Sequence, residues 1–220
     1  MTDSDWLVLR AMRPAIETLA LRVAEPGKIA IDFGCGSQPY RPLFASHGLQ
    51  YYGVDFEGGD IPILSNGRVD APDSCADLVL SFQVLEHVRD VDRYLQEARR
   101  LLRRDGCLIL STHGNWLFHP HPEDHRRWTR QGLLAELRKN GFEIIECVPV
   151  LGPMAWTTLL RLTCGYQLLL KCPLLGRMLA KSLAVIMNLK GCVEDLITPE
   201  WVRGDNACVY VTLSRAGAPG

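Results

Sequence analysis

Short apolar runs alternate with longer segments of helical periodicity along most of the chain. Strands are predicted where branched and aromatic side chains cluster between polar and glycine-rich stretches, namely at 28–33, 50–54, 77–82, 106–112, 142–148 and 207–213, with a short strand near Val69. Strands separated by helical segments form parallel sheets with helices on both faces. The pattern therefore predicts one α/β domain over residues 1–220, with a doubly wound, mostly parallel sheet of seven strands.

Start and stop signals mark two of the predicted helices. Apolar side chains recur on one face of residues 91–103, and Arg103 and Arg104 stand at the predicted C-terminal end, where cations are favoured. Thr129 can cap a helix over 130–140, because its hydroxyl can accept from a free amide of the first turn, and a glycine follows. We expect both helices to cover the sheet.

Two further helical segments flank the alternating pattern. Residues 1–24 predict an N-terminal helix, from Asp5 onward, that packs outside the sheet or over a bound ligand. Residues 151–195 form an insertion before the last strand, and no Asp or Glu occurs between Cys147 and Val193. Part of this insertion is a basic amphipathic helix, with Arg177, Lys181 and Asn188 opposite leucine and isoleucine side chains. The insertion predicts a lid over an apolar substrate, a homodimer contact or a peripheral membrane contact.

The end of the first strand carries the most informative motif. Residues 32–36 read Asp-Phe-Gly-Cys-Gly, and glycine permits the sharp turn and the close approach to a ligand that this position needs. Asp55 ends the second strand, where it can accept from a ribose hydroxyl pair. Pro39 replaces the third glycine of a dinucleotide motif, and the chain has no phosphate loop. The turn therefore predicts a nucleoside ligand without a phosphate chain.

These motifs resemble those of the class I S-adenosylmethionine-dependent methyltransferases. The first motif of that family reads like residues 32–36, and matching elements follow in order at Asp55, 69–71, 77–82, 84–88 and 101–110. The resemblance implies a Rossmann-like methyltransferase sheet. It also implies S-adenosyl-L-methionine as the cofactor, with S-adenosyl-L-homocysteine as the product.

The resemblance further implies which residues bind the cofactor. Asp32 and the glycines would lie under the methionine part, Asp55 would hold the ribose, and Asp70 the adenine edge. Phe82 would line the pocket near the sulfonium. Arg41 would pair with the methionine carboxylate or, alternatively, be a solvated residue at a helix start. The complete set is Asp32, Gly34, Cys35, Gly36, Arg41, Asp55, Asp70, Ala71 and Phe82.

Glu86 and His87 stand where some methyltransferases hold a divalent cation. Gln83 takes the position of the first glutamate of such a cluster, and a neutral amide is a poor ligand for a hard cation. We therefore predict that Glu86 and His87 cap and order the next helix, and that no metal is bound.

A histidine- and proline-rich segment, residues 111–129, follows the fifth strand. It resembles a loop of many small-molecule and cell-surface-sugar methyltransferases, although His125 stands where tyrosine is usual. Its histidines lack the spacing that puts two metal ligands on one helix face. A histidine with a near-neutral pKa suits proton removal from a hydroxyl acceptor. The candidate bases are His113, which is preferred because it directly follows the strand, and His119, His121 and Asp124. Asp124, Arg126 and Arg127 could instead pair and hold the loop.

Composition limits the kinds of partner and the cellular compartment that we expect for the protein. A net charge of −1 and a pI of about 6.6 show no general attraction to nucleic acid. The eight cysteines are scattered without a C-x-x-C pair, as is usual for reduced thiols. The acidic N-terminus lacks the pattern of a signal peptide, and no long uncharged apolar stretch predicts a membrane span. These features predict a cytoplasmic protein.

The most direct reading is a methyltransferase that acts on a small molecule by in-line displacement, most simply at a hydroxyl. N- or C-methylation of a lipid-like or sugar substrate would need orientation more than a base. A non-catalytic S-adenosylmethionine-binding subunit that supports a partner is the alternative from another class. Pro39 disfavours an NAD-binding oxidoreductase.

Overall fold

The computed structural model describes residues 1–217. The strands are β1 (Ile29–Phe33), β2 (Gln50–Asp55), β3 (Ile61–Pro62), β4 (Ala76–Phe82), β5 (Leu102–His113), β6 (Phe142–Val150) and β7 (Val209–Ala216). The helices are α1 (Trp6–Ala20), α2 (Arg41–Ser46), α3 (Val91–Leu101), α4 (Arg130–Lys139), α5 (Pro153–Leu170), α6 (Gly176–Ile197) and α7 (Glu200–Asp205). A single 3₁₀ turn, η1 (Leu85–His87), follows β4.

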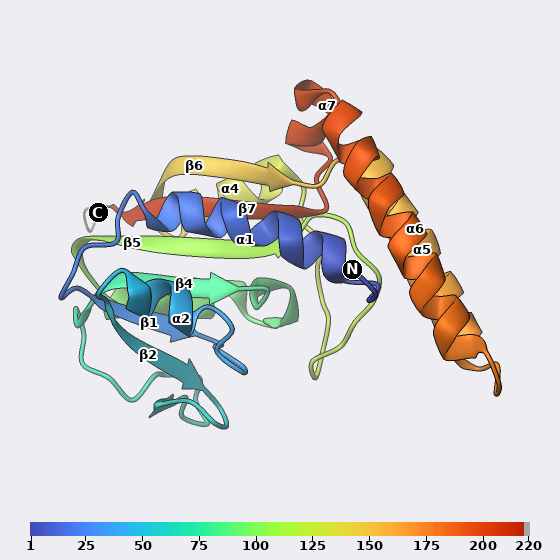
Figure 1. Ribbon diagram of the computed structural model, residues 1–220. Helices are drawn as coiled ribbons and strands as arrows, with labels where there is room; N and C mark the ends of the chain where they lie inside the picture. Colours follow the sequence, from blue (N-terminus) through green and yellow to red (C-terminus); the bar gives the residue numbers. More distant parts are fainter. Residues whose placement is uncertain (218–220) are drawn as a thin grey trace.

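The seven strands form one sheet in the order β3-β2-β1-β4-β5-β7-β6 (Figure 1). The first five are parallel to one another, whereas β7 runs antiparallel to both β5 and β6. This confirms the predicted doubly wound, mostly parallel sheet. The strand order reverses between β1 and β4, and ligands bind at the carboxyl ends of the strands beside such a reversal.

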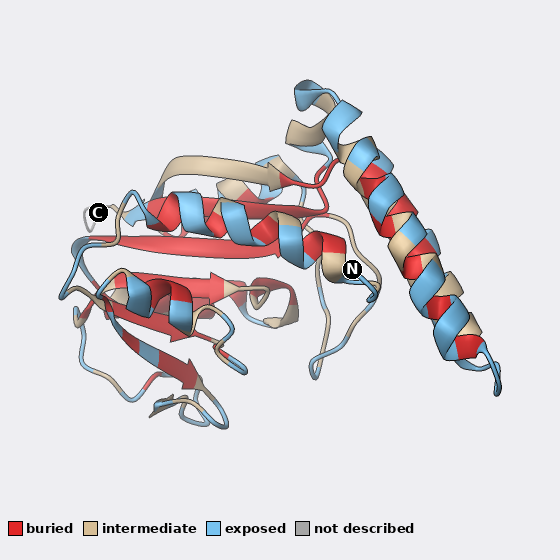
Figure 2. Cartoon of the chain, in the orientation of Figure 1, coloured by how far each residue is buried: buried red, intermediate tan, exposed pale blue. Residues whose placement is uncertain are grey.

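Helices cover both faces of the sheet and create two cores. On β5, Cys107 and Ile109 pack with α1 and α2, whereas Leu108 and Leu110 pack with α3 and α4. This alternation follows from the two-residue period of a strand. Because both faces are covered, the central strands are buried along most of their length (Figure 2). Burial on both faces also explains why these strands appear in the sequence as continuous apolar runs.

The junction between α3 and β5 differs from the prediction. The helix ends at Leu101, and β5 already begins at Leu102, so Arg103 and Arg104 belong to the strand and not to the helix end. Asp105 adopts a positive φ of 64° within the strand. The predicted capping role of Glu86 and His87 is also wrong: the Asp90 carboxylate accepts from the Arg93 amide and caps α3.

The structure confirms one predicted helix start and shifts the predicted edge strand. The Thr129 hydroxyl accepts from the Gly132 amide at the start of α4, which confirms the predicted cap. The short edge strand lies at Ile61–Pro62, and Val69 makes only an isolated bridge to Ile63. Ala216 belongs to β7, and residues 218–220 lie outside the described part of the chain.

The insertion before β7 is a helical hairpin, formed by α5 and α6, that projects from the edge of the domain (Figure 1). The side of α6 that carries Arg177, Lys181 and Asn188 is in part the packed side. Small residues such as Ala180, Ala184 and Gly191 are buried there, and Asn188 donates to the backbone oxygens of Met1 and Asp3 at 2.9 and 3.0 Å. Small side chains let the helices approach closely, so the larger apolar side chains of α6 point outward.

Candidate functional site

A cavity of about 1160 Å³ opens at the carboxyl ends of the central strands. Its lining comes from the segments that follow β1, β2, β4 and β5, and from one face of α1 that includes Val8 and Met12. Helix α1 thus lies over the cavity, which was one of the two positions predicted for it. Among the described residues, none from 151–195 lines this cavity. The hairpin therefore does not contact this cavity in the structure, and the lid stays one of the three roles predicted for it.

The glycine turn, residues 32–36, is shaped by its backbone. The amides of Gly34 and Cys35 both donate to the Val54 carbonyl, at 2.8 and 3.1 Å. Gly34 has a φ of +85°, and a Cβ there would lie 2.7 Å from Cγ2 of Val84. Gly36 also has a positive φ, but a Cβ there would meet nothing within 4 Å. Gly34 is thus needed for packing, while Gly36 leaves open space at the cavity wall, as a ligand-binding turn requires.

Asp55 lies at the cavity wall with its carboxylate held in place. It accepts from the Gly36 amide at 2.8 Å through Oδ2 and from the Phe56 amide at 2.8 Å through Oδ1. A carboxylate oxygen has more than one acceptor site, so both oxygens can still accept from a ligand. The position agrees with the role predicted for Asp55 toward a ribose.

Asp32 lies beneath the turn and is buried, behind the residues that line the cavity. Burial raises the pKa of its carboxyl to about 7, the Tyr51 hydroxyl that donates to it opposes this rise, and the Asp55 charge adds to it. Its predicted closeness to a ligand ammonium is therefore indirect. Cys35 does line the cavity, but burial raises the pKa of its thiol to about 11, which keeps it protonated.

Three predicted contacts do not reach the cavity. Arg41 pairs with Asp60 and stacks on the Tyr51 ring at 5.0 Å, so its charge is directed away from the predicted methionine carboxylate. Asp70 is exposed outside the lining, and the Ala71 carbonyl accepts from Arg100. The reason is local: the isolated bridge between Ile63 and Val69, and the bonds from the Arg100 guanidinium to the Val69 and Ala71 carbonyls, hold this segment against α3.

Phe82 lines the cavity as predicted, beside a residue whose role the sequence did not suggest. Gln83 has a φ of 56° just after β4, and its side-chain nitrogen Nε2 donates to the Ser111 hydroxyl at 2.9 Å. Its Oε1 is buried and has no hydrogen-bond partner within residues 1–217. An acceptor fixed in this way at the cavity wall suits a ligand donor. Phe56, directly after Asp55, is a second lining residue that was missed.

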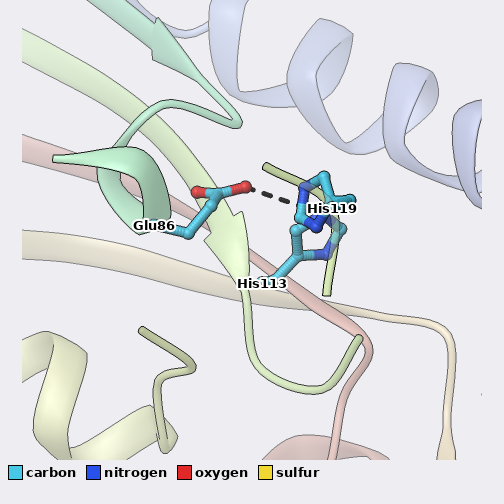
Figure 3. A group of neighbouring side chains, drawn as sticks. All are labelled: Glu86, His113 and His119. Carbon is cyan, nitrogen blue, oxygen red and sulfur yellow. Dashed lines mark ion pairs between the residues drawn. The ribbon is translucent and has the colours of Figure 1, made fainter. Parts of the chain in front are cut away.

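Three side chains meet at the cavity wall, which His113 from β5 and His119 from the following loop line and behind which Glu86 from η1 lies (Figure 3). Glu86 Oε1 lies 3.6 Å from Nε2 of His113, while Oε2 accepts from the Thr112 hydroxyl at 2.8 Å. Burial raises the pKa of Glu86 and lowers that of His113 to about 3. Both shifts favour the uncharged forms. Glu86 Oε1 and His113 Nδ1 have no hydrogen-bond partner among the described residues.

The same three residues could hold a divalent cation. One ligand atom from each lies within 4.8 Å of the others, and two histidines with one carboxylate are a known set for transition metals. The absence of helical spacing, used above against a metal site, is therefore not a valid objection, because the fold brings ligands from separate segments together. Absence of a bound metal stays a prediction.

An ion pair within the histidine loop, residues 113–128, holds His119 in place. Asp124 accepts from Arg127 at 2.6 and 2.7 Å and from the His119 amide at 2.9 Å, and only 1% of its side chain is exposed. Hydrogen bonding from Arg127 holds the pKa of Asp124 well below its usual range. Asp124 therefore pairs with Arg127 within the loop, as one of the two predictions for it had it, and its lowered pKa makes it a weak base.

The ring of His119 is oriented by its neighbours. Its Nδ1 lies 3.0 Å from the Leu117 carbonyl, which can only accept, and 3.4 Å from the Asp124 carboxylate. Arg127 Nη2 also lies 3.4 Å from Nδ1, but it donates to the Leu117 carbonyl at 2.6 Å and to Asp124 at 2.7 Å. The contact with the Leu117 carbonyl therefore favours the neutral tautomer with the proton on Nδ1 and the lone pair on Nε2. Burial lowers the pKa of His119, which keeps the imidazole uncharged at neutral pH. His113, His119 and His121 all line the cavity.

Comparison with known sequences identifies the family. The profile described as "Methyltransferase domain" matches residues 7–147. A probable S-adenosylmethionine-dependent methyltransferase of Mycolicibacterium smegmatis is 28% identical over 152 residues, which cover 61% of this chain and 58% of that protein. Ubiquinone biosynthesis O-methyltransferase of Azorhizobium caulinodans is 28% identical over 149 residues, which cover 53% and 59%. The chain thus matches less than two thirds of the length of these relatives.

Solved structures give the same fold. The [4+2]-cyclase SpnF superposes with a TM-score of 0.61 at 18% identity, covering 96% of this chain and 82% of that one. The 1,6-didemethyltoxoflavin-N1-methyltransferase of Burkholderia thailandensis superposes with a TM-score of 0.59 at 17% identity, covering 94% and 78%. The profile match contains the glycine turn, Asp55 and the histidine loop, so the chain belongs to the methyltransferase-domain family, as its resemblance to class I S-adenosylmethionine-dependent methyltransferases predicted.

Proposed function

We propose that the protein transfers the methyl group of S-adenosylmethionine to a hydroxyl oxygen of a small-molecule acceptor. The proposal rests on the position and surroundings of His119. Its ring lines the cavity, its proton is assigned to Nδ1 by the Leu117 carbonyl, and its Nε2 is left free to accept a proton. A hydroxyl needs such a base, whereas an amine or an activated carbon does not.

The cavity wall fits the nucleoside part of this cofactor. The open space at Gly36 admits the ligand close to the backbone, and Asp55 can accept from the ribose hydroxyls. Gln83 Oε1 offers an unpaired acceptor to an amino group of the ligand. Asp32 then supplies negative potential from beneath the turn.

When bound, S-adenosylmethionine supplies an electrophilic methyl group on a sulfonium that leaves as the neutral thioether S-adenosylhomocysteine. The acceptor oxygen forms the new bond to carbon as the carbon–sulfur bond breaks, and the hydroxyl proton passes to Nε2 of His119. Asp124 and Arg127 fix the ring from behind. Proximity and alignment in the cavity contribute the greater part of the acceleration.

We assign the base to His119 in preference to His113. The pKa of His113, lowered to about 3 by burial, makes it a poor proton acceptor at neutral pH. Its ring stacks on Trp116 at 5.5 Å and faces Glu86, which suits a supporting role. Direct base catalysis contributes roughly 10²–10⁴-fold, so the two histidines can be separated by substitution.

The test measures S-adenosylhomocysteine formation with a panel of catechols, phenols, sugars, amines and carbon acids. We expect turnover of a hydroxyl acceptor to rise with pH through a pKa below 6.5 and then level off. His119→Gln should lose at least about 10²-fold in turnover together with this pH limb. His121→Gln, which changes another histidine of the cavity, is the matched control.

Other outcomes would replace the proposal. Turnover of amines or carbon acids alone, insensitive to His119→Gln, would indicate N- or C-methylation. Tight S-adenosylhomocysteine binding with no turnover of any acceptor would favour a cofactor-binding subunit. We predict that turnover survives EDTA; loss on chelation with recovery on adding one divalent metal would show that Glu86, His113 and His119 bind a cation.

A further inference from the structure

The tip of the hairpin exposes an apolar surface with no partner among residues 1–217. At the end of α5, the turn and the start of α6, the exposed side chains include Leu168, Leu170, Leu174, Leu175, Met178 and Leu179, and 93% of Leu174 is accessible. The hairpin extends well beyond the sheet and its other helices (Figures 1 and 2). Clustered apolar exposure of this kind marks an interaction surface.

Cations lie among these apolar side chains. Lys171, Arg177 and Lys181 are exposed near the tip, and none of the three has an ion-pair partner within the described chain. No Asp or Glu occurs from 148 to 193, so the tip carries positive charge alone. Apolar side chains interspersed with unpaired lysine and arginine fit the boundary between the headgroups and acyl chains of an anionic bilayer.

We propose that the hairpin tip docks on an anionic lipid bilayer. Charge complementarity separates this occupant from a second copy of the chain: a symmetric contact between two tips would bring six unpaired cations together at a surface that should be depleted of charge. The docking is interfacial, because no helix among the described residues is long and apolar enough to cross a membrane.

The middle of α6 adjoins the cavity through α1. Asn188 of α6 holds the backbone of Met1 and Asp3, and a Cβ on Gly191 would lie 2.5 Å from Cδ2 of Leu7. The opposite side of α1 presents Val8 and Met12 to the cavity. A docked tip would therefore hold the cavity at a fixed distance from the lipid surface. The docking itself does not depend on which acceptor is methylated.

Sedimentation with vesicles tests the docking. We expect the full chain to bind phosphatidylcholine vesicles that contain about 30% phosphatidylserine as the anionic lipid. Added salt should weaken this binding. Arg177→Glu with Lys181→Glu should lower the partition coefficient at least about 30-fold, from about 1 kcal/mol for each cation. Arg104→Glu with Arg138→Glu, which reverses two exposed cations of the α/β domain, should leave it within about threefold.

A second pair of variants separates insertion from charge. Leu174→Ser with Leu175→Ser should weaken binding about tenfold or more while retaining its salt dependence. Unchanged S-adenosylhomocysteine affinity in each variant would show that the domain is intact. No binding by the wild type, or equal binding to vesicles of phosphatidylcholine alone, would overturn the proposal. A dimer that forms without lipid and dissociates in Leu174→Ser with Leu175→Ser would overturn it in favour of a second copy.

Discussion

The glycine turn and the histidine loop face each other across one cavity, but they are fixed in different ways. In the turn, the Gly34 and Cys35 amides bond to the Val54 carbonyl, so the backbone of two strands sets the geometry. In the loop, charged side chains do so: Arg127 binds Asp124, and Arg126 donates to the Val88 carbonyl. The cofactor side should therefore tolerate side-chain changes better than the acceptor side. Three predictions test this difference.

The largest effect is expected at Arg127. Arg127→Met leaves the buried Asp124 carboxylate unpaired, which costs roughly 3–5 kcal/mol of unfolding free energy. Misplacing His119 should also lower turnover by about 10²-fold, while S-adenosylhomocysteine affinity stays within about threefold. Chemical denaturation and calorimetry measure these separately. A large loss of affinity would show that the two sides are not independent.

Two checks sharpen this prediction. Arg127→Met with Asp124→Asn should be more stable than Arg127→Met alone, because no unpaired charge remains. Since the pKa of Asp124 is lowered in the folded protein, the pair stabilises above the ordinary pKa and loses its effect as pH falls through the folded value. The difference between wild type and Arg127→Met should therefore be constant from pH 5 to about 8 and shrink below about pH 4.

Burial of Asp32 predicts a pH effect on the cofactor side. Its pKa is raised from 3.8 to about 7, so its contribution to stability is full below about pH 4 and is lost as pH rises through 7. Asp32→Asn removes the ionisation and retains an acceptor for the Tyr51 hydroxyl. Without ligand, the variant should gain stability relative to wild type between pH 5 and 8, by at most about 4 kcal/mol. Parallel stability curves would contradict this; Asp73→Asn, at an exposed carboxylate, is the control.

The smallest effects compare Asp55 with Arg41. Asp55→Ala should weaken S-adenosylhomocysteine binding by about ten- to a hundredfold, from the loss of roughly 1.5–3 kcal/mol of charge-assisted hydrogen bonds. Arg41→Gln should change affinity less than about threefold, because its exposed pair with Asp60 contributes about 1 kcal/mol at most. Calorimetry measures both. Equal losses in the two variants would show that Arg41 turns toward the ligand when it binds.

How far the sequence could predict the site depends on what fixes each residue. Gly34, Gly36 and Asp55 lie at strand ends, and strand ends are legible from apolar runs. Arg41 could not be placed from the sequence, since its partner Asp60 follows an edge loop of unpredictable course. From the sequence, Gln83 could be interpreted only as a residue that replaces a metal ligand. Its positive φ could not be predicted, because glutamine is not a residue type typical of that conformation.

The acceptor side shows the same limit more strongly. Proline and histidine content marked the loop after β5, yet the convergence of His119 with Glu86 and His113 depends on contacts between segments far apart in sequence. On α6 the sequence predicted a basic face opposite an apolar face, but it did not show which side of the helix packs on the rest of the protein. The small side chains of Ala180 and Ala184 pack inward, and the larger apolar side chains, such as Leu175 and Leu179, point outward.

The position of β7 in the sheet has a consequence for how the chain folds during synthesis. This strand is the last of the seven along the chain and therefore the last to leave the ribosome. In the sheet it lies between β5 and β6, with Cys107 paired to Arg215, so it joins β6 to the other strands. Until it arrives, the edge of β5 is open and β6 has no neighbour, while the apolar hairpin has already emerged. Long-range pairing of this kind is slow and exposes strand edges to aggregation. Early capture of the hairpin by a lipid surface would keep the unfinished chain apart from its copies.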